Sequence, residues 1–236
     1  GWSDVDTGAL QGIAITSKAG NGTWQYSTDG VTWASFGVVS STNALLLGGS
    51  TQVRYIPDGQ NGETATFGFQ AWDQTSGTAS TNGLARYANP GTGGGTTAYS
   101  SQSATASLTV SSANDAPTMT AGATVTLSAT DENTNSAGTL ASSIVSSAGW
   151  ADTDAGALKG LAVTGKTGNG TWQYSTDGTN WTNFGTVSVT QGLLISSTSQ
   201  IRYVPDGRNG ETATFSFVAW DQTTGTASAS GSPSYA

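Results

Sequence analysis

The side chains in this sequence that could do chemistry are carboxylates, and most of them recur in fixed places. They occur as D-x-D pairs, at the end of an alternating aromatic run, in a P-D-G-x-N-G-E turn, and near an N-D-A-P step. Calcium takes about six to eight oxygen ligands, largely carboxylates and carbonyls on loops. The candidate calcium ligands are Asp152, Asp154, Asp221, Asn114, Asp115, Asp58, Glu63, Asp4, Asp6, Asp73 and Glu132.

The ordinary alternative for each of these residues is a turn. Asp and Asn stabilise turns by bonding to nearby backbone N–H groups, and this explains any one of them taken alone. Taken as a set, the D-x-D pair and the N-D step favour calcium. Asp152 and Asp154 are two residues apart, so on extended backbone their side chains point the same way. Asn114 and Asp115 should pass beside them.

A second chemistry open to carboxylates is glycoside hydrolysis, which needs two of them. Here the carboxylates are duplicated together with their surroundings, and an enzyme seldom needs two copies. The chain has no His and no Cys, which excludes a Ser-His-Asp triad, a thiolate nucleophile and a zinc–thiolate site. We therefore expect a protein that is not an enzyme.

Composition also excludes classes of partner. The chain has 236 residues, with 7 Lys and Arg against 15 Asp and Glu, for a net charge of −8. So few basic residues cannot form a nucleic-acid-binding surface. No apolar run approaches the roughly 18 residues of a membrane span, so no membrane insertion is expected. A surface rich in Ser, Thr and Gly is typical of secreted β-rich repeats.

An internal duplication sets the domain organisation. Residues 1–80 align without gaps with residues 149–228, and 53 of the 80 pairs are identical. Residues 81–148 have no copy, and within them Asn114-Asp115-Ala116-Pro117 is the best linker. The sequence therefore predicts two domains, 1–114 and 115–236.

The local patterns predict short strands. Residues 63–73 alternate, with Ala65, Phe67 and Phe69 on one face, as in a half-buried strand. Asn21-Gly22 signals a tight hairpin turn, in which both residues need a positive φ. Residues 140–145 carry a short helical pattern. Together these features predict an all-β protein with two tandem antiparallel β-sandwiches.

The two predicted sandwiches differ in which strands they hold. Residues 118–129 suggest a first strand in the second repeat, and the first repeat has no counterpart of it. Residues 96–110 suggest a closing strand in the first repeat, and the second has no counterpart. We expect each sandwich to expose an unpaired edge. A longer array of repeats, or strand exchange between chains, would cover it.

The order of these motifs resembles a known family. The run R-Y-[IV]-P-D-G-x-N-G-E-T-A-T-F-x-F-x-A-W-D, followed by a strand and N-D-A-P, is similar to the cadherin-like tandem repeats of large bacterial extracellular proteins. Asp131-Glu132-Asn133 is similar to their x-E-N motif and Asp152-x-Asp154 to their D-x-D, while no D-R-E is present. The resemblance implies immunoglobulin-like sandwiches, calcium at domain junctions, and secretion or display on a bacterial cell surface, in an adhesin or filament. Neighbouring repeats of the same protein would be its partners.

The tryptophans suggest an alternative function. Trp33, Trp181, Trp72 and Trp220 fall near predicted strand ends, where a sugar could stack on an indole ring. That would make the chain a lectin-like module with a carbohydrate or cell-surface ligand. Packing in the core or at its rim is the other explanation for the same residues.

Overall fold

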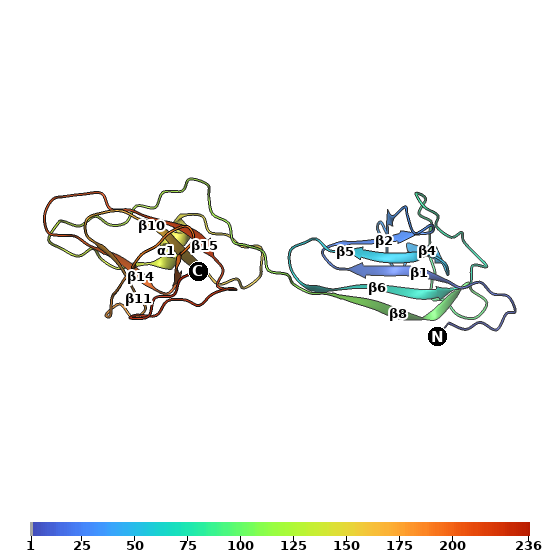
Figure 1. The fold of residues 1–236 in the computed structure, drawn as a ribbon. Coiled ribbons are helices and arrows are strands. Elements are labelled where there is room, and N and C mark those ends of the chain that lie inside the picture. Colours follow the sequence, from blue (N-terminus) through green and yellow to red (C-terminus); the bar gives the residue numbers. More distant parts are fainter. Residues whose placement is uncertain (1) are drawn as a thin grey trace. The chain divides into compact units, whose positions relative to one another are not determined.

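A computed structural model describes residues 2–236, and the protein in it is all-β. The chain divides into two compact units, Gly1–Ala113 and Asn114–Ala236, here called unit 1 and unit 2 (Figure 1). Asn114 thus falls in the second unit. Within the described residues, no helix is long and apolar enough to cross a membrane.

Unit 1 contains two antiparallel sheets that enclose a core. The larger sheet has the order β7-β4-β1-β6-β8, with strands Tyr87–Ala88, Ala44–Gly48, Gly12–Ala19, Glu63–Trp72 and Tyr99–Val110. The smaller sheet has the order β3-β2-β5, with strands Ala34–Ser35, Thr23–Ser27 and Gln52–Ile56. Ile15, Leu45 and Phe67 of the first sheet pack with Trp24 and Tyr26 of the second. The arrangement is that of a β-sandwich.

The alternation in β6 explains which of its faces is inside. Ala65 and Phe67 are buried and Phe69 is half-buried, while Thr64 is exposed. The Phe67 ring lies edge-on to the Trp24 ring, with 4.9 Å between centroids. The predicted inward face of this strand is therefore confirmed.

Unit 2 repeats the plan with fewer paired strands. One sheet has the order β13-β10-β15, with strands Leu193–Ser196, Gly160–Lys166 and Phe215–Trp220. The other has the order β12-β11-β14-β9, with strands Thr182–Asn183, Thr171–Ser175, Gln200–Val204 and Thr139–Leu140. The predicted short helix is confirmed as α1, Ala141–Ser147, which buries Ile144 and Val145 in the core of this unit.

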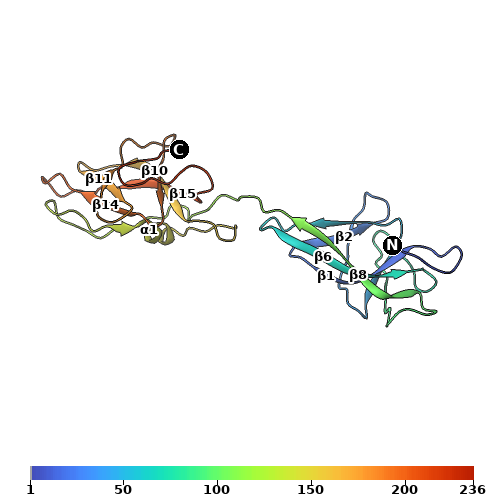
Figure 2. The same cartoon turned by 90° about the horizontal axis from the view of Figure 1, so that it is seen from below.

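The two predicted terminal strands have different outcomes. The closing strand of unit 1 is confirmed as β8, which lies beside β6 along unit 1 (Figure 2). The first strand predicted at 118–129 is wrong: only Thr118 forms an isolated bridge, with Ala151. A strand exists only when a ladder partner satisfies its backbone, and β15 is the outermost strand of its sheet. For the same reason β15 begins at Phe215, although its counterpart β6 begins at Glu63.

The predicted hairpin at Asn21-Gly22 is also wrong. The strands on either side of it, β1 and β2, belong to different sheets, so the turn is a corner between sheets. Its positive φ, 121°, is at Gly20. Gly22 is needed because a Cβ there would overlap the carbonyl oxygen of Ile56.

The structural repeat extends past the last aligned residue, Ser80. Tyr87 on β7 donates a hydrogen bond to the Phe36 carbonyl at 2.9 Å. Tyr235 donates the equivalent bond to the Phe184 carbonyl, also at 2.9 Å, and forms a bridge with Leu193. Sequence identity weakens here, but the two tyrosines keep the same contact, and so this part of 81–148 does have a copy.

Candidate metal site in unit 2

The D-x-D pair of unit 2 fastens the segment that opens this unit. The backbone N–H of Asp154 donates to Asp152 Oδ1 at 2.8 Å, which closes a local turn. Asp154 Oδ2 accepts a hydrogen bond of 2.7 Å from the backbone N–H of Asp115. Thr118 and Ala151 exchange two backbone hydrogen bonds just beyond this point. The pair therefore does act as a turn, and it also binds the linker residue.

Asp221 holds the same segment from the end of β15. The side chain is 7% exposed, and its Oδ1 accepts bonds from the N–H and the hydroxyl of Thr223, at 2.9 and 2.7 Å. Its Oδ2 accepts a bond of 2.8 Å from Nδ2 of Asn114. Burial acts to raise the pKa of Asp221, but the bonds from Thr223 and Asn114 outweigh it, and the pKa is lowered. Asp221 is therefore an anion at neutral pH.

Two carboxylate oxygens at this site have no partner. They are Asp152 Oδ2 and Asp154 Oδ1, and both are buried. An ionised carboxylate can only accept hydrogen bonds, and a buried oxygen that receives none is costly. A bound cation or an ordered water molecule would satisfy two such oxygens.

The carboxylates alone do not complete a metal shell. Across residues 2–236, no group of three or more His, Cys, Asp or Glu side chains is placed to hold a metal ion. The two bare oxygens of Asp152 and Asp154 are thus the acidic part of the candidate site. The remaining ligands for a cation would come from neutral oxygens, such as the amide oxygen of Asn114, or from water.

The counterpart carboxylates in unit 1 form the same local hydrogen bonds, but no linker segment binds to them. The N–H of Asp6 donates to Asp4 Oδ1 at 2.8 Å, but both side chains are exposed. Asp73 accepts from the N–H and hydroxyl of Thr75, at 2.8 and 2.6 Å, and is half-buried. Within the described part of unit 1, no segment covers these residues as Asn114 and Asp115 cover theirs.

The structure places the other three candidates at separate turns. Asp58 is exposed and accepts from the N–H of Gln60 at 3.1 Å. Glu63 accepts from the N–H of Asn21 at 2.8 Å and from the hydroxyl of Tyr55, which lowers the pKa of Glu63. These two residues belong to unit 1. Glu132 lies beside Gly207 in unit 2.

Sequence reasoning missed the role of the duplicated tyrosine and glutamate. In unit 2 the hydroxyl of Tyr203 donates to Glu211 and accepts from the N–H of Gly170 at 2.6 Å. Glu211 also accepts from the N–H of Asn169 at 2.8 Å. The signal was available, because G-N-G, R-Y and N-G-E recur together in both repeats. These four residues form one corner, which we call the Tyr–Glu corner.

The tryptophans near strand ends are covered to different extents. Trp72 and Trp220 are 1% and 8% exposed, which confirms the packing interpretation for them. The guanidinium of Arg54 lies 4.1 Å above the Trp33 ring, and that of Arg202 lies 4.0 Å above the Trp181 ring. A sugar would have to displace these arginines in order to stack on those faces.

No protein-family model matches this chain, and no curated protein or solved structure matches it. The internal duplication is the comparison that the chain itself provides. Each residue of unit 2 can thus be compared with its counterpart in unit 1.

Proposed function

We propose that the chain is a tandem pair of immunoglobulin-like, cadherin-like repeats from a secreted or surface-displayed bacterial protein. Its role is structural and adhesive, in an array or filament, and calcium fastens the segment that leads into unit 2. The all-β sandwich architecture and the whole-unit duplication support a repeat module. The observation that carries the calcium proposal is the pair of buried, unpartnered oxygens on Asp152 and Asp154.

The charge of this site and its oxygen ligands suit calcium. Two like charges about 4 Å apart repel by about 4 kcal/mol at an effective dielectric near 20. A calcium ion offsets that repulsion, and it accepts irregular shells of carboxylate, amide and water oxygens. The NH₂ group of Asn114 donates to Asp221, so the amide oxygen of Asn114 can serve as a ligand to the cation. Extracellular modules bind calcium at about 10⁻⁴–10⁻³ M, which suits a surface protein.

The duplicated carboxylates support a structural role over glycoside hydrolysis. A glycosidase needs one carboxylic acid that is still protonated near its working pH, so that group has a raised pKa. Asp29, Asp177, Glu63 and Glu211 instead have lowered pKa values, because neighbouring side chains and backbone N–H groups donate to them. Each is committed to holding a turn, which fits a scaffold.

Calorimetric titration of calcium into the chain tests this proposal. We expect saturable binding at about 10⁻⁴–10⁻³ M. We also expect slower protease cleavage near Asp115 with calcium than with chelator. The double variant Asp152→Asn with Asp154→Asn should abolish both effects. The matched variant Asp4→Asn with Asp6→Asn, in the exposed pair of unit 1, should preserve them. If calcium neither binds nor protects at millimolar concentration, the pair is only a turn.

A further inference from the structure

Each unit presents an arginine stacked on a tryptophan at the outward face of one sheet, the sheet of β2 and β5 or of β11 and β14. In unit 2 the guanidinium carbon of Arg202 lies 4.0 Å from the centre of the Trp181 ring. In unit 1 that of Arg54 lies 4.1 Å from the centre of the Trp33 ring. A guanidinium stacked in this way covers one of its faces, and its N–H edge is left for other partners.

A glutamine on the neighbouring strand fixes the plane of each guanidinium. Arg202 Nε donates to Oε1 of Gln173 at 2.9 Å, and Arg54 Nε donates to Oε1 of Gln25 at the same distance. The two residues of each pair lie directly opposite each other in the antiparallel ladder. In unit 2 the NH₂ group of Gln173 donates in turn to Oδ1 of Asn183 at 2.8 Å. The arginine is therefore held by the ring on one face and by the amide at Nε.

The terminal nitrogens of these two arginines have no partner within residues 2–236. Arginine has five N–H donors, and the bond to glutamine uses only the one on Nε. Burial alone lowers the pKa of Arg202, and no carboxylate acts on it. Acidic residues outnumber basic ones by 15 to 7, so scarcity of acids does not explain an unpaired arginine. Each guanidinium keeps a planar fork of Nη1 and Nη2 free.

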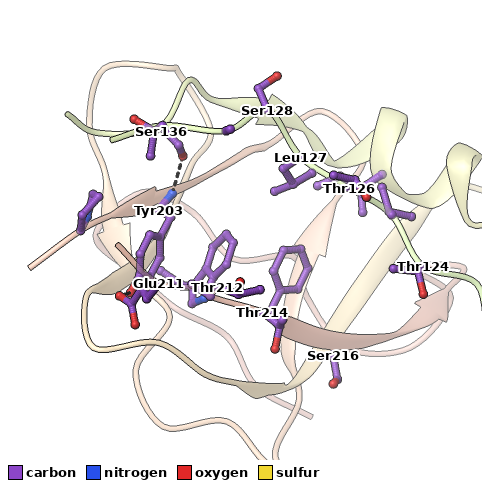
Figure 3. Close-up of a pocket in the computed structure, with 18 of the residues that line it drawn as sticks. Thr124, Thr126, Leu127, Ser128, Ser136, Tyr203, Glu211, Thr212, Thr214 and Ser216 are labelled. Carbon is purple, nitrogen blue, oxygen red and sulfur yellow. Dashed lines mark hydrogen bonds between the residues drawn. The ribbon is translucent and has the colours of Figure 1, made fainter. Parts of the chain in front are cut away.

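The fork stays free beside different neighbouring segments in the two units. In unit 2 residues 136–140 lie along β14, where Ser136 Oγ accepts from the N–H of Tyr203 at 2.8 Å (Figure 3). In unit 1 β8 is present, and it pairs with β6 in the other sheet. Arg202 is half-buried and Arg54 is exposed, and glutamine is the one acceptor that each contacts in the described chain. The free fork therefore belongs to the sheet face itself.

The duplication retains this group while other exposed positions change. We call the group the Trp–Arg–Gln trio, and its members are Trp33, Arg54 and Gln25 in unit 1 and Trp181, Arg202 and Gln173 in unit 2. By contrast, the exposed residues Val31 and Val38 are replaced by Thr179 and Thr186, which are exposed too. Core packing does not require identity on a solvent-facing surface, so the retained trio points to binding.

We propose that the trio binds the carboxylate of an acidic polysaccharide, with one sugar acid held in each unit. The fork of Nη1 and Nη2 matches the two oxygens of a carboxylate, and such bidentate pairs are charge-assisted and directional. The ring and the glutamine hold the fork in place before the ligand binds, which lowers the entropic cost of binding. The carboxylate approaches the edge of the guanidinium, so the arginine stays on its tryptophan.

The surroundings of the fork favour a sugar acid over an acidic peptide. By strand alternation, Thr171 and Gln200 lie on the same outward face as Gln173, and Asn183 lies opposite Gln173. Their hydroxyl and amide groups are suited to the hydroxyls of a sugar. A peptide is recognised instead at a groove or at the edge of a sheet, and this surface is the face of paired strands.

A polymer of sugar acids also suits the low affinity of a single site. One exposed ion pair contributes little to affinity, so the partner should carry a carboxylate on many of its sugars. Sites on successive repeats then bind one polymer together, and this linkage raises the overall affinity. The net charge of −8 disfavours non-specific binding to polyanions, so measured binding would report a local site.

The test measures binding of the full chain to immobilised polygalacturonate, which has a carboxylate on every sugar, by biolayer interferometry. Its methyl ester is the matched ligand, because it has the same sugars without the charge. We expect saturable binding to polygalacturonate, and binding to the ester that is roughly tenfold or more weaker. The experiment is run in chelator. Failure here therefore leaves the calcium proposal standing, and failure of calcium binding leaves this one.

Two double variants separate the shape of the fork from its charge. Arg54→Lys with Arg202→Lys keeps the charge and loses the planar fork, so it should bind roughly tenfold or more weakly. Arg86→Gln with Arg208→Gln removes two exposed charges, one in each unit, and should bind like the parent. Thermal unfolding shows whether both variants are folded, and the comparison of polymer with ester needs no variant.

Three results would overturn the proposal. They are the absence of binding at millimolar sugar acid, equal binding to polygalacturonate and its ester, and equal binding by the lysine variant and the parent. Poly-L-glutamate is tested alongside, and we expect it to bind more weakly than polygalacturonate. If it binds equally well, the fork recognises acidic peptides and the assignment to a polysaccharide is wrong.

Discussion

The hydroxyl of Tyr203 donates a hydrogen bond of 2.5 Å to Oε1 of Glu211. The same pair recurs in unit 1 as Tyr55 and Glu63. In each unit the glutamate lies eight residues after the tyrosine, and both side chains bond to the backbone of one corner, which lies between β1 and β2 in unit 1 and between β10 and β11 in unit 2. The Tyr–Glu corner thus fixes the chain where it passes from one sheet to the other.

The corner predicts a loss of stability in acid. The pKa of Glu211 is lowered from 4.5, because Tyr203 and the N–H groups of Asn169 and Gly170 donate to the ionised form. The stability that this adds is present above the ordinary glutamate pKa and is lost as pH falls through the lowered value. Urea unfolding from about pH 6 to about pH 3 should show this loss. In the variant Glu211→Gln, the free energy of unfolding should depend less on pH over this range. If its pH dependence equals that of the parent chain, Glu211 does not make this contribution.

The stability of the fold should also fall at alkaline pH, because the pKa of Tyr203 is raised. Burial first, and then the bond to Glu211, raise the pKa of Tyr203 from 10.0 to about 12. The neutral phenol therefore stabilises the fold below pH 10, and this contribution disappears as pH rises through about 12. Tyr203→Phe should cost about 1–3 kcal/mol at neutral pH, because Glu211 and Gly170 lose a partner. It should also reduce the alkaline loss of stability. Ultraviolet titration of the phenol absorbance would follow this group directly.

The different burial of Phe67 and Phe215 predicts unequal costs for truncating these two equivalent phenylalanines. Phe67→Ala should lower the unfolding free energy of unit 1 by about 3–5 kcal/mol, because it empties a buried site. Phe215→Ala should cost less, since that ring is only half-buried. Thr64→Ala, on the exposed face of β6, serves as the control with a change near zero. Equal losses for Phe67 and Phe215 in chemical denaturation would contradict the burial difference.

Gly170 lies close to the backbone of Val204, and this contact gives a further prediction. A Cβ on Gly170 would overlap the carbonyl oxygen of Val204, so Gly170→Ala must displace the corner. We expect a loss of about 1–3 kcal/mol, as for overpacking. Gly210→Ala is the matched control, because a Cβ there meets nothing within 4 Å. Thermal unfolding of the two variants in parallel would separate them, and a neutral Gly170→Ala would refute the close approach.

The sequence predicted the parts of the fold that depend on local alternation. The inward face of β6 and the helix at Ala141–Ser147 both followed from periodicity. The hairpin at Asn21-Gly22 did not, because the same two residues suit a corner between sheets, and sheet membership is set by distant strands. Residues 118–129 have a strand's composition, but composition cannot supply the ladder partner that a strand needs.

The candidate ligands were likewise predicted only in part. Asn114, Asp115, Asp152, Asp154 and Asp221 come together in unit 2, because the N-D step passes both the D-x-D turn and the end of β15. Asp58 and Glu63 belong to unit 1, and each holds a turn there. The carboxylate of Glu63 accepts from the Tyr55 hydroxyl and from the N–H of Asn21. The spacing of residues in a motif cannot show which hydrogen-bond donors lie beside a side chain in the folded protein.

The near-identity of the β6 and β15 edges gives β8 two docking choices while the chain folds. Because Phe67 and Phe69 recur as Phe215 and Phe217, a nascent β8 that pairs with β15 would satisfy much of the same register. Synthesis order favours the native choice, since residues 1–110 leave the ribosome before β15 exists and domains fold as units, N-terminal first. Refolding of the whole chain from denaturant has no such order. We therefore expect a slow, mispaired fraction in refolding that vectorial synthesis avoids.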